Sequence, residues 1–143
     1  MILNNNHNDS EIRRQVDEAL GKPYSLLERI KQGGIGSGRL LIHDASEPLA
    51  NCLAKDHDLK YASMELRPKG IILYLRNKIN EYMWIIPYYK LSIYKSDWFS
   101  VHADGMRMRF HVKSVYPYNA KFVSKLMDRK AQHSIPSPLD QTL

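Results

Sequence analysis

The spacing of apolar residues predicts helices at the start of the chain. One helix is indicated by apolar residues that recur every three or four positions, namely Ile12, Val16, Ala19 and Leu20. A second, shorter helix follows Pro23, and we expect it to pack through Leu26, Leu27 and Ile30. The sequence therefore predicts a helical hairpin over residues 9–32, preceded by a poorly ordered arm over residues 1–8.

Strands are predicted between residues 38 and 113. Before residue 60, the uncharged segment Gly33–Gly38 is interpreted as a flexible linker, and one short helix directs Cys52 inward. After residue 60 the apolar period becomes two, because Ala62, Met64 and Leu66 alternate with polar residues. Further strands are expected over Ile71–Arg76, in the run Tyr82–Tyr94 that Pro87 interrupts, and over Trp98–Ala103 and Met106–Lys113.

The dipeptide Asp104-Gly105 predicts a β-hairpin with a two-residue turn, because a type I′ turn needs positive φ at both central residues. This turn fixes the register, so that Val101 faces Met108 on one side of the hairpin and Ser100 faces Arg109 on the other. One face is then core. The other is predicted to be basic and aromatic.

The last predicted element is an amphipathic helix over residues 119–132. Asn119 is expected to cap this helix, and its inward positions are Phe122, Val123, Leu126 and Met127. Residues 133–143 are expected to form a mobile tail. The whole pattern predicts one α+β domain over residues 9–132, in which an antiparallel meander forms a small, partly open barrel or sheet with a C-terminal capping helix.

Three stretches carry a resemblance to a known family: Gly70–Asn77, Trp84–Tyr94, and the Asp104-Gly105 hairpin followed by the helix around Phe122–Leu126. Together they resemble bacterial pleckstrin-homology-like (PH-like) domains, which are related in fold to the GRAM domain, and the resemblance covers about residues 62–130. It implies a seven-stranded, partly open barrel that is capped by a helix and serves as a binding scaffold, often as an oligomer. Eukaryotic relatives bind phosphoinositides through a basic loop, and no comparable Lys/Arg cluster occurs here, so lipid head-group binding is not implied.

The formal net charge of +6 lies in one segment. Between Lys60 and Lys113 the chain has ten basic and four acidic side chains, whereas the remainder has equal numbers of each. A candidate binding face for nucleic acid or another polyanion follows from the hairpin register and its end: Trp98, His102, Arg107, Arg109, His111 and Lys113. The alternative, which the alternating pattern favours, is that these charges only keep a solvent-facing strand soluble.

Tyrosine is the second compositional signal, with nine in the chain. Tyrosine suits a boundary because its ring is apolar and its tip is polar, so a cluster often lies under a partner. We take Tyr82, Tyr88, Tyr89 and Tyr94 as a candidate partner surface. A tyrosine-rich rim of a barrel explains the same cluster equally well.

No residue pattern predicts catalysis, a cofactor or a metal site, since the His and Asp groupings are adjacent in sequence and Cys52 lies on an apolar stripe. A single cysteine excludes an intramolecular disulfide and suits a reducing compartment. No apolar run approaches about 18 residues, so we expect no secretion signal and no membrane span. The sequence thus predicts a non-enzymatic cytoplasmic module that acts through a protein partner or as a homo-oligomer, with polyanion binding as the alternative.

Overall fold

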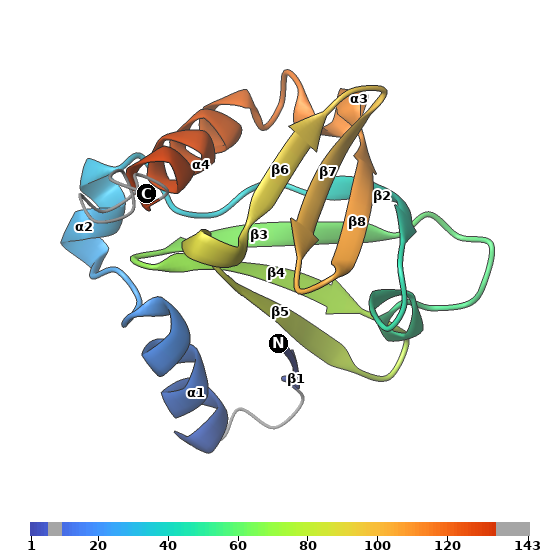
Figure 1. Cartoon of the computed structure of the whole chain (residues 1–143), viewed down its shortest axis with the longest axis horizontal. Helices are drawn as coiled ribbons and strands as arrows, with labels where there is room; N and C mark the ends of the chain where they lie inside the picture. Colours follow the sequence, from blue (N-terminus) through green and yellow to red (C-terminus); the bar gives the residue numbers. More distant parts are fainter. Residues whose placement is uncertain (6–9, 134–143) are drawn as a thin grey trace, which may run out of the picture.

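The computed structural model describes residues 1–5 and 10–133, and their dominant feature is one antiparallel β-sheet (Figure 1). Its strands are β1 (Ile2–Asn4), β2 (Leu40–Ala45), β3 (Tyr61–Arg67), β4 (Gly70–Arg76), β5 (Glu81–Pro87), β6 (Ser92–Lys95), β7 (Trp98–Ala103) and β8 (Met106–His111). The helices are α1 (Ser10–Leu20), α2 (Leu26–Lys31), α3 (Val112–Val115) and α4 (Ala120–His133), and two 3₁₀ turns span Leu49–Cys52 and Tyr88–Lys90. The predicted α+β class is confirmed.

Two meanders make up the sheet, and β2 joins them. The order of the strands is β1-β5-β4-β3-β2-β8-β7-β6. The first half of β2 pairs with β3, and its second half pairs with β8 after a register shift between Ile42 and Asp44. Such an irregularity bends a strand, so β2 can serve both halves. Because β1 and β6 are the two edges, the described strands form an open sheet and not a closed barrel.

The predicted hairpin register is confirmed at every pair. Trp98 lies opposite His111, and Val101 lies opposite Met108. Asp104 and Gly105 have φ values of 51° and 76°, as a type I′ turn requires. The local turn chemistry therefore sets which side chains of β7 and β8 face the core.

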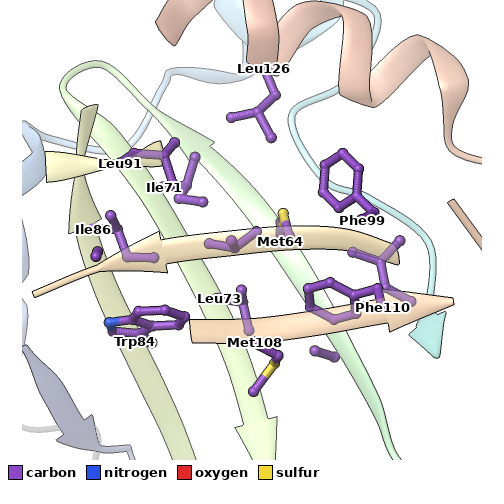
Figure 2. Packing of buried hydrophobic residues seen from close by; sticks show 14 of the residues in the cluster. Met64, Ile71, Leu73, Trp84, Ile86, Leu91, Phe99, Met108, Phe110 and Leu126 are labelled. Carbon is purple, nitrogen blue, oxygen red and sulfur yellow. The ribbon is translucent and has the colours of Figure 1, made fainter. Parts of the chain in front are cut away.

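The main core lies on the inner face of the sheet, beneath α4. Figure 2 shows side chains from β3, β4, β5, β7 and β8 gathered in this layer, with Leu126 of α4 above them. Trp84, Phe110 and Leu126 are fully buried. The predicted inward residues Phe122 and Val123 are buried as well, whereas Met127 is 43% exposed and does not belong to the inward stripe as expected.

A smaller core lies on the outer face, where α1 covers β4 and β5. Val16 and Leu20 of α1 pack there against Ile72, Met83 and Ile85. An ion pair ties the helix to the sheet, because a guanidinium nitrogen of buried Arg67 donates to Asp17 at 2.6 Å and also to the carbonyl of Gly21 at 2.7 Å. The first predicted helix is thus a sheet-covering helix.

Two segments that we expected to be poorly ordered or flexible gain backbone partners from distant strands. Ile2–Asn4, part of the predicted arm, pair with β5. The linker Gly33–Gly38 runs along β3, since the amide of Ser37 donates to the Met64 carbonyl at 2.8 Å. Residues 6–8 of the predicted arm and residues 134–143 of the predicted tail lie outside the described residues.

Two predicted features of the C-terminal third are wrong in detail. The strand expected to reach Lys113 ends at His111, because α3 begins at Val112. Asn119 does not use its side chain as the expected helix cap. Its amide oxygen accepts from the Gly38 amide at 2.7 Å, and its amide nitrogen donates to the Ser114 carbonyl at 2.9 Å. This buried amide fastens the start of β2 to the segment before α4.

Candidate binding surfaces

The predicted basic and aromatic face lies on the outer side of β7 and β8, away from α1. Trp98, His102, Arg109 and His111 are half-buried there, and Arg107 is exposed. Lys113 is exposed on α3, beyond the end of β8. The hairpin therefore brings five of the six predicted residues onto adjoining strands, and the sixth follows them at the strand end.

A stacked aromatic cluster forms on this face, and sequence reasoning missed one of its members. The ring of His43, on β2, lies 3.6 Å from that of Trp98 at an interplanar angle of 7°. His111 meets both rings edge-on, with centroids 5.3 Å and 5.2 Å away. The pairing of β2 with β8 creates this contact, and the hairpin alone gives no signal of it. One face of the Trp98 ring is already occupied by His43, which reduces the ring surface that a nucleic-acid base can stack on.

Much of the charge on this face is neutralised. Asp44 of β2 accepts from Arg109 through both carboxylate oxygens, with 2.7 Å between Nε of Arg109 and Oδ1. This hydrogen bonding holds the pKa of Asp44 below its usual value. Burial, with a further contribution from Arg107, lowers the pKa of His102, which favours its neutral form. Arg107 remains the main unpaired cation on the strands of this face.

The same neutralisation extends over the basic segment of the sequence. Five of its ten cations form ion pairs with acids among the described residues: Lys60, Arg67, Lys78, Lys90 and Arg109. Four of these five cations pair with acids from outside the segment, namely Asp17, Asp44 and Asp56. The local excess of positive charge in the sequence therefore does not produce an equally basic surface.

The four tyrosines of the candidate partner surface lie in different environments. Tyr88 is 1% exposed, and its hydroxyl donates to the Arg67 carbonyl at 3.1 Å, so this residue belongs to the core. Tyr82 is half-buried against the core. Tyr89 and Tyr94 are 75% and 59% exposed. Tyr94 contacts His102 edge-on, with the ring centroids 4.9 Å apart, and thus adjoins the β7–β8 face.

Helix α2 carries an apolar stripe that faces solvent, contrary to the sequence-based prediction that it packs. Leu26, Leu27 and Ile30 are 66%, 62% and 66% exposed, and no residue of α2 is buried. The helix is nevertheless well formed. Ser25 and Glu28 make a reciprocal capping box, in which each side chain accepts from the backbone amide of the other residue. We call Leu26, Leu27 and Ile30 the α2 stripe.

Helix α4 lies beside α2 (Figure 1), and two of its polar side chains contact the segments at the two ends of α2. The Lys125 ammonium donates to the carbonyls of Gln32, Gly33 and Gly34, at 3.2, 3.3 and 2.8 Å, just after the helix ends. Arg129 donates to the Tyr24 hydroxyl at 2.7 Å and to the side chain of Gln32. Both contacts use the ends of α2, so its apolar side chains remain available.

The two helices together are basic. Over α2 and α4 there are six lysines and arginines and two acids. Glu28, one of the two acids, is engaged in the capping box. The α2 stripe is therefore an exposed apolar surface on a helix pair whose charged residues are mostly basic.

Three further findings concern metal binding, the cysteine thiol and membrane-crossing helices. In the part of the chain that the structure describes, no three His, Cys, Asp or Glu side chains are grouped so that they could hold a metal ion. Cys52 is buried, and burial raises the pKa of its thiol. Across residues 1–5 and 10–133, no helix has the length and apolar character needed to cross a membrane.

Comparison with known proteins adds no relative. No protein-family model, no curated protein and no solved structure matches the chain.

Proposed function

We propose that this chain is a non-enzymatic interaction module of PH-like architecture, and that it binds an acidic, amphipathic segment of a partner protein through the α2 stripe. The architecture is supported by the element order, because β2–β5 and β6–β8 are meanders of four and three strands and α4 covers the core after them. In the family that the sequence resembles, this arrangement serves as a scaffold for binding.

The observation that carries the proposal is the exposure of the α2 stripe on an ordered helix. Large exposed apolar patches with polar rims mark interaction sites in proteins. The capping box and the contacts from Lys125 and Arg129 fix α2 before a partner arrives, so little ordering entropy is lost on binding. Apolar anchors on one face of a short helix fit a partner that presents an apolar helical face of its own.

Charge selects the kind of partner. The excess of basic residues on α2 and α4 favours acidic residues around the apolar anchors of the partner. The same excess opposes the docking of a second copy by the same surface, because like charges would face each other. Nucleic acid fits less well, since Leu and Ile side chains offer nothing to a phosphate and half of the cations in the basic segment are already paired.

The test is a titration of the full chain with a fluorescent peptide that presents leucine on one helical face and glutamate on the other. A peptide of the same composition with scrambled order is the reference. We expect the periodic peptide to bind and the scrambled one not to bind. Leu27→Ala should weaken binding about 5–30-fold, because roughly 1–2 kcal/mol of apolar burial is lost. Equal binding of both peptides, or an unchanged affinity in Leu27→Ala, would contradict the proposal.

Tyr94→Ala is the matched control, since Tyr94 is similarly exposed but lies on the sheet. It should leave peptide affinity within about twofold of the parent value. A labelled single-stranded oligonucleotide tests the alternative. Tight binding of the oligonucleotide that Arg107→Gln abolishes would replace the protein partner with a nucleic acid.

A further inference from the structure

A second surface feature lies on the outer face of the sheet, where β2 to β5 run side by side next to the area that α1 covers. It is a cavity of about 480 Å³, within the usual size range of small-molecule sites. Its polar lining consists of Arg39, Tyr61, Ser63, Tyr74, Arg76 and Glu81. The strand register brings these residues together, because Ser63 lies opposite Tyr74 and Arg76 lies opposite Glu81.

The two arginines distinguish this cavity from the others on the surface. Both are exposed, and no ion pair joins either of them to an acid within the described ranges. Two other cavities of similar size also contain lysines, but Lys90 is paired with Asp104 and Lys78 with Asp56, each at 3.3 Å. Two further cavities hold Arg13 beside a second arginine, but that second arginine is ion-paired in each case: Arg14 with Glu11 and Glu18, and Arg67 with Asp17.

The ring of Tyr61 orients one of the two guanidinium groups. The central carbon of the Arg39 guanidinium lies 3.9 Å from the centroid of this ring. A stacked guanidinium keeps its N–H groups free at its edge, so it can donate two parallel hydrogen bonds to an oxyanion. Tyr61 thus prepares Arg39 for an anion at little cost in side-chain entropy.

The remaining lining supplies neutral and accepting groups. The Tyr74 hydroxyl donates to Glu65 at 3.3 Å, and burial raises the pKa of this phenol, so Tyr74 adds no negative charge. The hydroxyl of Ser63 can donate or accept. The carboxylate of Glu81 can accept a hydrogen bond from a ligand hydroxyl but would repel an anion, so the anionic group of a ligand belongs beside the arginines.

We propose that this cavity binds a phosphate monoester of a small polyhydroxyl molecule, with Arg39 and Arg76 on the phosphate and Glu81 accepting from a ligand hydroxyl. A phosphate monoester has a charge of about −1.5 to −2 at neutral pH, which two arginines match. Arginine is also the side chain best shaped for phosphate, because its fork donates bidentate hydrogen bonds. No residue of α2 lines the cavity, so this site is independent of the partner surface.

Calorimetric titration of the full chain with ribose 5-phosphate tests the proposal, with ribose and inorganic phosphate as reference ligands. We expect ribose 5-phosphate to bind more tightly than inorganic phosphate, and ribose not to bind. Arg39→Gln and Arg76→Gln should each weaken binding at least about tenfold, because each removes charge-assisted hydrogen bonds. Glu81→Ala removes the acceptor for the ligand hydroxyl, so it should lower the affinity for ribose 5-phosphate relative to that for inorganic phosphate.

Arg13→Gln is the matched control, since it removes an exposed arginine that lies outside the cavity and outside both candidate binding surfaces. It should change the affinity by less than about twofold. Three results would overturn the proposal: no heat of binding at millimolar ribose 5-phosphate, an equal loss of affinity in Arg13→Gln, or equal affinities for ribose 5-phosphate and inorganic phosphate. All three arginines are exposed, so the variants should fold as the parent does.

Discussion

Truncation of Leu27 to alanine should barely change the stability of the protein, whereas the same truncation of Leu20 should be costly. Leu27 is 62% exposed on α2, and Leu20 of α1 is fully buried against the sheet. A buried Leu→Ala change typically costs about 3–5 kcal/mol, because apolar contact is lost and a cavity remains. At Leu27 most of the side chain is already in water and alanine is a good helix former, so we expect a change within about 0.5 kcal/mol.

Urea denaturation followed by far-ultraviolet circular dichroism measures both differences in the free energy of unfolding. The parent chain and both variants should have the same dependence on urea concentration, so that the midpoints alone report stability. A loss of stability in Leu27→Ala as large as that in Leu20→Ala would contradict this prediction, because it would mean that the α2 stripe packs against the protein in solution. The partner surface would then not exist.

Three further predictions concern the fold and its ionisation. Gly70→Ala should destabilise the protein by at least about 3 kcal/mol in thermal unfolding, because an added Cβ would lie 2.3 Å from the Ile86 carbonyl oxygen and 2.6 Å from Leu20. Gly36→Ala is the control, because an added Cβ there would lie 3.9 Å from the nearest atom, and its stability should stay within about 0.5 kcal/mol of the parent value. Equal losses of stability in the two variants would contradict the close packing around Gly70. Asp44→Asn should lower stability near neutral pH. The pKa of Asp44 is lower in the folded than in the unfolded protein. The stabilisation by its carboxylate is therefore complete above the unfolded pKa of about 3.9 and is lost as the pH falls through the folded pKa. If Asp44→Asn were still less stable than the parent in strong acid, the ion pair with Arg109 would be contradicted. Cys52 should react with a thiol reagent far more slowly in the native chain than in urea, since it is buried and its thiol pKa is raised; equal rates would place it at the surface.

Local features of the fold could be predicted from the sequence because short-range chemistry determines them. The dipeptide Asp104-Gly105 fixes a two-residue turn, and one turn then sets the partner of every residue in β7 and β8. Pro87 marks the interruption of the long aromatic run, where a 3₁₀ turn separates β5 from β6. The helices and strands with a regular apolar period could be predicted for the same reason.

Contacts between distant segments could not be predicted in this way. The charge of Arg109 is neutralised by Asp44, which lies 65 positions earlier and reaches it only because β2 pairs with β8. The stacking of His43 on Trp98 has the same origin. The sequence of an alternating basic strand is the same whether its charges are free or paired with distant acids. For that reason the predicted face carries less unpaired charge in the structure than the sequence indicated.

The α2 stripe shows a different limit. Its spacing correctly predicted an amphipathic helix, but the periodicity of a helix indicates only that one face is apolar. Whether that face meets the core or solvent depends on where the neighbouring elements lie. Here α1 covers the sheet and α4 holds α2 by its polar ends, so the stripe is left outside.

The most direct test of the partner surface is a map of backbone amide chemical shifts in the full chain during titration with the acidic amphipathic peptide. We expect the largest changes at residues 25–34 and in α4 around Lys125 and Arg129. Amides of β7 and β8 should hardly move. Shifts concentrated at Trp98 and Arg107, with α2 unchanged, would contradict the proposed partner surface and identify the sheet face as the binding surface.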